Sequence, residues 1–209
     1  MRKTKPDVCG GHRAEGFSLV EVLVVTLIII VIAAIGIPKL TTMTGNLKTR
    51  GDARDLNGAI VLAKMRAASD FARARVYADL SANTFRIEVY ESGSSTWVTN
   101  GCPNSCTGNQ SLSSGVSFGF GSLTSPPSGV ASLAQAPLCL KDNLTSTYAN
   151  TACVMFNSRG IPVDSTWSPT ATGALYVTNG NSVSGVTVSA TGLTKIWRSD
   201  ASTANWNQY

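Results

Sequence analysis

Residues 16–26 have the sequence GFSLVEVLVVT, and the run stays apolar as far as Ile37. Its single charged side chain is Glu21. A carboxylate inside a membrane-length segment costs roughly 2.5–3.5 kcal/mol on insertion scales, so it needs a positively charged partner. Cleavage after Gly16 would supply one, because it leaves Phe17 with a free α-amine one helical turn before Glu21. The segment therefore predicts a processed, membrane-anchored chain whose terminus and carboxylate pair within or between subunits.

This arrangement resembles the prepilin-type N-terminus of the type IV pilin-like proteins, in the residues GFSLVE at 16–21 and in Pro38 at the end of the apolar run. In that family a membrane aspartyl peptidase removes the leader and methylates the new terminus. The resemblance implies that Gly16 is the cleavage residue, Phe17 the N-methylated residue and Glu21 the assembly glutamate. It also implies an α+β, type IV pilin-like fold, in which a long N-terminal helix packs on a C-terminal antiparallel β-sheet.

The sequence predicts four segments. They are a leader peptide at residues 1–16, a transmembrane or filament-core helix at 17–37, a continuing amphipathic helix at 38–79 and a β-rich periplasmic domain at 80–209. The leader carries four basic residues against two acidic ones, which keeps its side of the membrane cytoplasmic. As a helix, the second segment would span about 31 Å, close to one bilayer core. We therefore expect a single-pass membrane protein, and the resemblance implies that it lies in the inner membrane and later enters a filament.

Two simpler interpretations of the apolar run stay open. One is a secretory signal peptide, with residues 19–32 as its apolar core and the small residues of 34–36 as its cleavage site. That interpretation leaves Glu21 inside the core and Pro38 just past the cut, and both are unfavourable. The other is a plain membrane anchor that is never processed.

Beyond the apolar run the helix is expected to continue, loosened at Pro38 because proline removes a backbone donor. Apolar residues then recur at helical spacing, which predicts a stripe that faces the protein core and implies no cofactor. The stripe comprises Leu56, Ile60, Ala63, Ala67, Phe71 and Ala74. Residues 39–77 carry eight basic against three acidic side chains, whereas residues 78–209 carry five against six. The basic side chains are expected to meet anionic lipid headgroups or acidic residues of neighbouring subunits.

From residue 80 the pattern changes to short alternating segments, which are typical of strands. Strands are expected at residues 85–90, 96–98, 116–120, 153–156, 174–178, 186–189 and 194–198. Residues 122–150 contain a Pro-Pro pair and many small residues, so an irregular excursion is expected there.

Five cysteines are present, and removal of the leader removes Cys9. The other four predict two disulfides in an oxidising compartment, with three connectivities open. Cys102 and Cys106 are close enough for a local loop, which would leave Cys139 and Cys153 as a staple worth on the order of 3 kcal/mol. A zinc site is the alternative, but the spacing lacks a CxxC pair and no histidine is nearby. We favour the disulfides.

Three later segments resemble one branch of the same family, the H-type minor pseudopilins of type II secretion and the FimT-like minor pilins. They are the arginine- and alanine-rich residues 65–75, FNSRG at 156–160 and VSATGL at 188–193. The resemblance implies a structural subunit of a type II secretion pseudopilus or a type IV pilus. Its implied partners are the prepilin peptidase and other pilin or pseudopilin subunits.

An enzyme is not expected, nor a cofactor or a metal site. The only histidine, His12, lies in the predicted leader, so histidine-based catalysis is excluded after processing. The chain has no P-loop and no GxGxxG motif after a strand. Two other functions stay open: a DNA-uptake minor pilin, although the outer domain lacks a basic cluster, and a membrane-anchored binding domain.

The C-terminal residues offer two interpretations. Trp197, Arg198, Trp206 and Tyr209 belong to residue types that are enriched at binding surfaces. The alternative, which we favour, is that Trp197 packs in the core and residues 205–209 form a loose tail.

Overall fold

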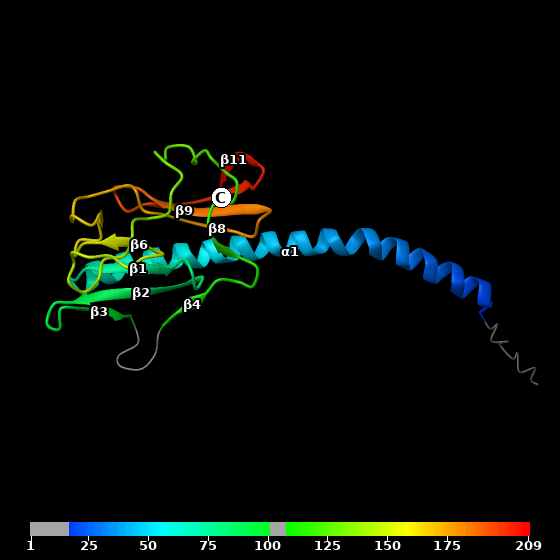
Figure 1. Cartoon of the computed structure of the whole chain (residues 1–209), viewed down its shortest axis with the longest axis horizontal. Helices are drawn as coiled ribbons and strands as arrows, with labels where there is room; N and C mark the ends of the chain where they lie inside the picture. Colours follow the sequence, from blue (N-terminus) through cyan, green and yellow to red (C-terminus); the bar gives the residue numbers. More distant parts are fainter. Residues whose placement is uncertain (1–16, 101–107) are drawn as a thin grey trace, which may run out of the picture. The chain divides into compact units, whose positions relative to one another are not determined.

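The computed structural model describes residues 17–100 and 108–209 (Figure 1). The chain forms two compact units, Met1–Thr41 and Thr42–Tyr209. One helix, α1 (Leu19–Ser69), begins in the first unit and ends in the second. The two units differ in the burial of the α1 side chains. Among the described residues, α1 packs on other elements only in the second unit.

In the first unit, α1 buries no side chain over residues 17–41. A helix can form there without partners, because its backbone groups bond within the segment. Its apolar side chains point to all sides: Leu19 is 80% exposed and Ile30 is 67% exposed. The helix continues through Pro38, which contributes no backbone donor. A helix that is apolar all round belongs in lipid or among other helices.

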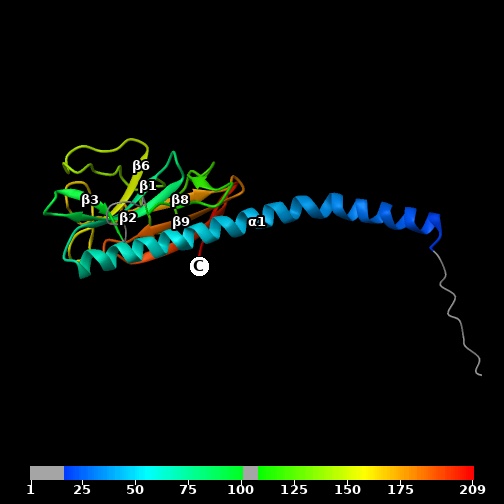
Figure 2. The same cartoon turned by 90° about the horizontal axis from the view of Figure 1, so that it is seen from below.

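In the second unit, α1 buries one face against the strands (Figure 2). The buried residues recur three or four positions apart, as expected of one helix face. They are Thr49, Asp52, Ala53, Leu56, Ala59, Ile60, Ala63 and Ala67. The predicted stripe is thus confirmed for its first four members, which are all fully buried.

Two antiparallel sheets cover this face of α1. The first has the order β3-β2-β1-β6-β7, with β4 paired to the start of β2. It comprises β1 (Ala74–Asp79), β2 (Thr84–Glu91), β3 (Thr96–Thr99), β4 (Gln110–Ser111), β6 (Thr151–Phe156) and β7 (Pro162–Val163). The second has the order β11-β10-β9-β8-β5. It comprises β5 (Ser117–Phe118), β8 (Ala174–Thr178), β9 (Ser182–Val188), β10 (Thr194–Asp200) and β11 (Thr203–Gln208).

The main core lies between α1 and the two sheets. Leu56 and Ile60 from the helix meet Val76 of β1, Val154 of β6 and Val186 of β9, all at most 2% exposed. Full burial of such a side chain contributes roughly 1.5–3 kcal/mol. The predicted α+β fold, a long helix packed on antiparallel β-structure, is confirmed, with the strands divided between two sheets rather than one.

The helix ends at Ser69, well before the predicted boundary at residue 79. Phe71 has a φ of 49°, a left-handed conformation that stops a helix, and its side chain is 85% exposed. Ala74 lies in β1, which pairs with β2 on one side and β6 on the other. These two ladders outweigh the local helix propensity, so Phe71 and Ala74 do not belong to the helical stripe.

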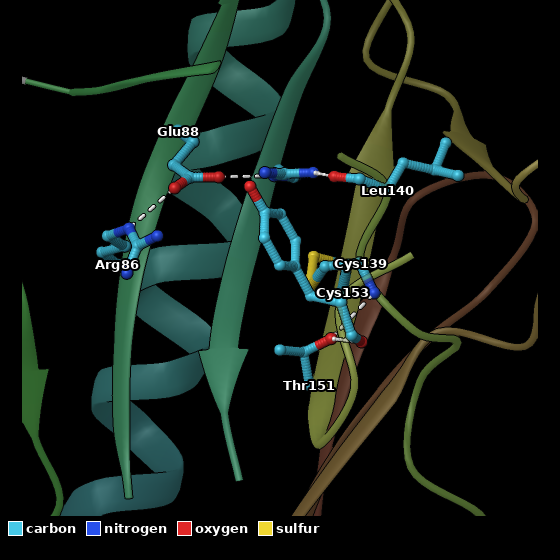
Figure 3. The surroundings of a disulfide bond; sticks show 8 residues. Arg86, Glu88, Cys139, Leu140, Thr151 and Cys153 are labelled. Atoms are coloured by element: carbon cyan, nitrogen blue, oxygen red, sulfur yellow. Dashed lines mark hydrogen bonds and ion pairs between the residues drawn. A yellow bond between two sulfur atoms is a disulfide. The ribbon is translucent and has the colours of Figure 1, made fainter. Parts of the chain in front are cut away.

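The predicted disulfide between Cys139 and Cys153 is confirmed, with an S–S distance of 2.05 Å. It joins the irregular excursion to β6 (Figure 3). The backbone N–H of Cys139 also donates to Oγ1 of Thr151 at 3.1 Å. The excursion over 122–150, which the structure describes throughout, is irregular as predicted, apart from a single bridge between Leu140 and Thr147.

A buried ion pair lies beside the disulfide. Arg75 on β1 is 1% exposed, and its Nε donates to Oε2 of Glu88 on β2 at 2.5 Å. Its Nη1 donates to the carbonyl of Leu140, and its guanidinium lies 3.9 Å from the ring centroid of Trp97. The second oxygen of Glu88 accepts a bond from Nε of Arg86 at 2.7 Å (Figure 3). Burial lowers the pKa of Arg75 from its usual value, and the carboxylate of Glu88 opposes that shift.

We expect Glu88→Gln to lower the free energy of unfolding by about 3–5 kcal/mol, because it leaves the buried guanidinium of Arg75 without a counter-charge. Chemical denaturation of the full chain in neutral detergent, followed by near-ultraviolet circular dichroism, measures this loss. Glu91→Gln is the matched control, since Glu91 is an exposed residue of the same strand and its change should stay within about 0.5 kcal/mol. Equal losses for the two variants would contradict the role of the ion pair.

Candidate functional site

The predicted assembly residues lie at the start of α1. Phe17 and Ser18 precede the helix, and Glu21 lies in its first turn. The backbone N–H of Val22 donates to the carbonyl of Ser18 at 3.2 Å and so begins the helical bonding. Phe17 is 81% exposed, and Glu21 is exposed as well. Both groups are therefore accessible at the same end of the helix. Gly16, the predicted cleavage residue, lies outside the described residues.

The residues at the start of the helix also match a capping pattern in sequence. Ser18, followed three residues later by Glu21, matches the capping-box pattern, in which the two side chains satisfy free backbone donors. A carboxylate in the first turn gains about 0.3–1 kcal/mol from the helix macrodipole. A glutamine would complete the same cap without carrying a charge into an apolar segment. The cap alone therefore does not explain why residue 21 is charged.

The first part of α1 is apolar and long enough to cross a membrane, judged by its length and composition. None of the side chains in its most apolar stretch is buried within the protein. Exposed apolar area costs about 25 cal/mol per Å² in water. This part of α1 therefore needs a lipid bilayer or neighbouring helices around it.

The described residues offer no metal centre: no group of three or more His, Cys, Asp or Glu side chains that could hold a metal occurs among them. Cys139 and Cys153 are bonded to each other, so neither is a free thiolate ligand for zinc. Cys102 and Cys106, the other predicted disulfide pair, lie outside the part of the chain that the structure describes.

One short motif matches an enzyme signature in sequence alone. Residues 115–119 are GVSFG, which fits the GxSxG pattern of serine hydrolases. In those enzymes the serine sits on a sharp strand-to-helix turn beside a histidine. Here Ser117 lies in β5, which pairs with β8, and the described residues include no histidine. The motif therefore carries no catalytic geometry.

The structure corrects the expectation of a loose C-terminal tail. Thr203–Gln208 form β11, which pairs with β10. Trp206 packs against Tyr176, with ring centroids 5.8 Å apart, and its Nε1 donates to the carbonyl of Ser125 at 2.8 Å. Trp197 is buried, as predicted, and its indole N–H donates to Thr187 at 2.8 Å. Burial raises the pKa of Tyr176 to about 12.

Comparisons with known proteins were made at the level of sequence and structure. No family model matches the chain, and no curated protein sequence matches it. Two solved structures of the minor pseudopilin EpsH, from the type 2 secretion system of Vibrio cholerae, are similar to it. The first is 12% identical with a TM-score of 0.44, and covers 71% of this chain and 95% of that chain. The second is 12% identical with a TM-score of 0.42, and covers 71% and 92%. Likeness at this level assigns no function, which has to be argued from the chain's own residues.

The exposed apolar part of α1 generates a prediction about membrane insertion. Some twenty apolar residues favour insertion by roughly 6–10 kcal/mol, and each arginine at the helix centre costs roughly 3 kcal/mol. We expect the double variant Ile28→Arg/Ile32→Arg to lose most of its membrane-inserted fraction, measured by alkaline extraction of membranes. Ile28→Leu/Ile32→Leu is the control and should stay inserted. Full retention of the arginine variant in the membrane would show that this segment is not what anchors the chain.

Proposed function

We propose that this chain is a minor pilin or pseudopilin, a structural subunit of a type II secretion pseudopilus or a type IV pilus. The prepilin peptidase removes residues 1–16 and methylates Phe17. The apolar helix then holds the chain in the inner membrane, with the β-rich part in the periplasm, until the subunit enters a filament. The role needs no cofactor and no catalytic group.

One observation carries the proposal. The helix exposes apolar side chains on every side, and its only charged residue before Lys39 is Glu21, one turn from the residue that follows Gly16. A plain anchor has no use for a charge near the end of its span, and insertion scales penalise it. A neighbouring terminal amine changes this, because its attraction to the Glu21 carboxylate in apolar surroundings offsets the cost of removing the two charges from water.

The same geometry suggests how a subunit is positioned in the filament. Apolar burial between helices is non-directional and sets no register along the axis. An ion pair between Glu21 of one subunit and the Phe17 amine of another is directional and forms at one axial offset only. In the proposed assembly, helix packing supplies the affinity and this ion pair supplies the register. The partners are therefore other pilin or pseudopilin subunits.

Leader processing tests the first half of the proposal. We expect the membrane-extracted protein to begin at Phe17 with one added methyl group, measured by intact mass and N-terminal sequencing. Gly16→Ala should leave the leader attached, because the peptidase requires the small residue at that position. Gly11→Ala, the same change within the leader, is the control and should be processed normally. A mature start at Ile37 would instead identify a secreted domain, and a start at Met1 a plain anchor or binding module.

Assembly tests the second half. In cells that express the complete pilus or pseudopilus system, we expect Glu21→Gln to be processed normally but to fall at least about tenfold in the sheared filament fraction. An unpaired amine in apolar surroundings costs about 3–5 kcal/mol, and glutamine keeps the helix cap. Asp55→Asn, at an exposed acidic residue of the same helix, is the control. Incorporation of Glu21→Gln at the normal level would remove the register argument while leaving processing intact.

A further inference from the structure

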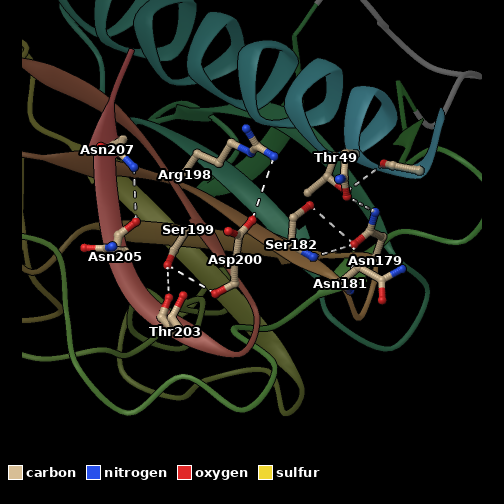
Figure 4. Close-up of polar contacts among 12 residues, drawn as sticks. Thr49, Asn179, Asn181, Ser182, Arg198, Ser199, Asp200, Thr203, Asn205 and Asn207 are labelled. Carbon is tan, nitrogen blue, oxygen red and sulfur yellow. Dashed lines mark hydrogen bonds and ion pairs between the residues drawn. The ribbon is translucent and has the colours of Figure 1, made fainter. Parts of the chain in front are cut away.

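A cleft of about 360 Å³ lies within the second unit, between α1 and the last two strands. Figure 4 shows Arg198 and Asp200 beneath the helix, with Asn205 and Asn207 on the neighbouring strand. We call this the arginine cleft, because three arginines line it. Its principal lining residues are Arg50, Arg54, Arg198, Asp200, Asn205 and Asn207.

Among the described residues, the arginines in this cleft have few hydrogen-bond and ion-pair partners. Nε of Arg50 and Nε of Arg198 are buried and have no hydrogen-bond partner among the described residues. The only ion pair of the cleft in that part of the chain joins Arg198 to Asp200 at 3.9 Å, and the Asp200 side chain is 68% exposed. Arg54 only lies over the ring of Tyr209, 5.9 Å from its centroid. These two Nε atoms are closed off inside the protein, so the donors that a ligand in the cleft can reach are the other N–H groups of the three guanidiniums.

The chemistry of the lining selects an anion. Three guanidinium groups face one carboxylate, so the cleft carries a net positive charge. A guanidinium offers a planar fork of donors that fits a carboxylate or a phosphate through two parallel bonds. The asparagines of β11 add neutral polar groups to the same wall. We propose that the arginine cleft binds an aspartate or glutamate side chain presented by a partner protein.

A carboxylate suits the cleft better than a nucleic-acid backbone. Nucleic acids bind through a series of phosphate contacts, each of which adds to the affinity. Residues 78–209 carry five basic against six acidic side chains, so the strands that bear the cleft supply few further cations. The proposal concerns the second unit alone and holds whether or not the chain enters a filament.

The test uses the full chain in neutral detergent at low ionic strength, with a fluorescein-labelled tetraglutamate peptide as the probe and fluorescence anisotropy as the readout. We expect saturable binding, weakened about tenfold or more by Arg50→Gln and by Arg198→Gln, since each removes a charge-assisted bond. Arg66→Gln is the matched control, because Arg66 is an exposed arginine of the same helix outside the cleft, and its variant should bind as the wild type does.

Two further variants keep the test independent of folding defects. Asp200→Asn should tighten binding, because it removes the negative charge that competes with the peptide for Arg198. Arg54→Gln changes an exposed side chain and should weaken binding without altering the thermal unfolding curve. A gain of affinity in the first variant cannot arise from misfolding.

Three results would overturn the proposal. The first is the absence of saturable peptide binding. The second is an equal loss of binding in Arg66→Gln, which would reduce the effect to overall charge. The third is tighter binding of pentathymidylate, which carries four phosphates, lost in the same cleft variants. That third result would assign the arginines to nucleic acid instead.

Discussion

Small residues on one face of α1 set the distance at which the sheets approach the helix. The face consists of Ala53, Ala59, Ala63 and Ala67, all at most 6% exposed, interleaved with the fully buried Leu56 and Ile60. Protein interiors pack as densely as organic crystals, so a larger side chain at an alanine would push strands away from the helix. Strands of both sheets contribute to this one core. The arginine cleft, which lies between α1 and the last two strands, depends on this packing.

One continuous helix thus meets two opposite requirements. Over residues 19–37 it is apolar on all sides apart from Glu21, and no described residue buries its side chains. Over residues 49–67 the apolar residues narrow to a stripe, and the stripe is covered by strands. The first pattern satisfies backbone donors internally and leaves side chains for lipid or other helices. The second can form only where a sheet supplies the opposite surface. The chain thus combines an apolar helical segment that is long enough to cross a membrane with a folded unit that covers the rest of the helix.

Local patterns predicted those parts of the fold in which neighbours in sequence decide the structure. The helical stripe from Leu56 to Ala67 and most strand positions follow from hydrophobic periodicity. Cysteine count and spacing predicted disulfides but left three connectivities open, and the structure shows the Cys139–Cys153 bond. The sequence did not predict β1, because Arg75 interrupts its apolar pattern. Arg75 is buried, and Glu88 on the next strand supplies the counter-charge that makes its burial tolerable. β11 was missed because it is an exposed, polar edge strand whose hydrogen bonds to β10 leave no signal in its own sequence. Local patterns could not predict the arginine cleft, because its arginines come from α1 and β10, which are adjacent only after folding.

The arginines of this protein show two ways of accommodating a buried guanidinium. Arg75 is buried completely, and its carboxylate, carbonyl and aromatic partners all come from within the chain. Nothing further is needed there, and the group is structural. Arg50 and Arg198 are only partly buried, yet each places a donor out of reach of water and of any acceptor in the described chain. In the described chain Arg198 has one ion pair, to the exposed Asp200 at 3.9 Å, and the cleft opens to the surface. A partner's carboxylate can therefore approach the accessible N–H groups of these guanidiniums, which offer a planar fork of donors.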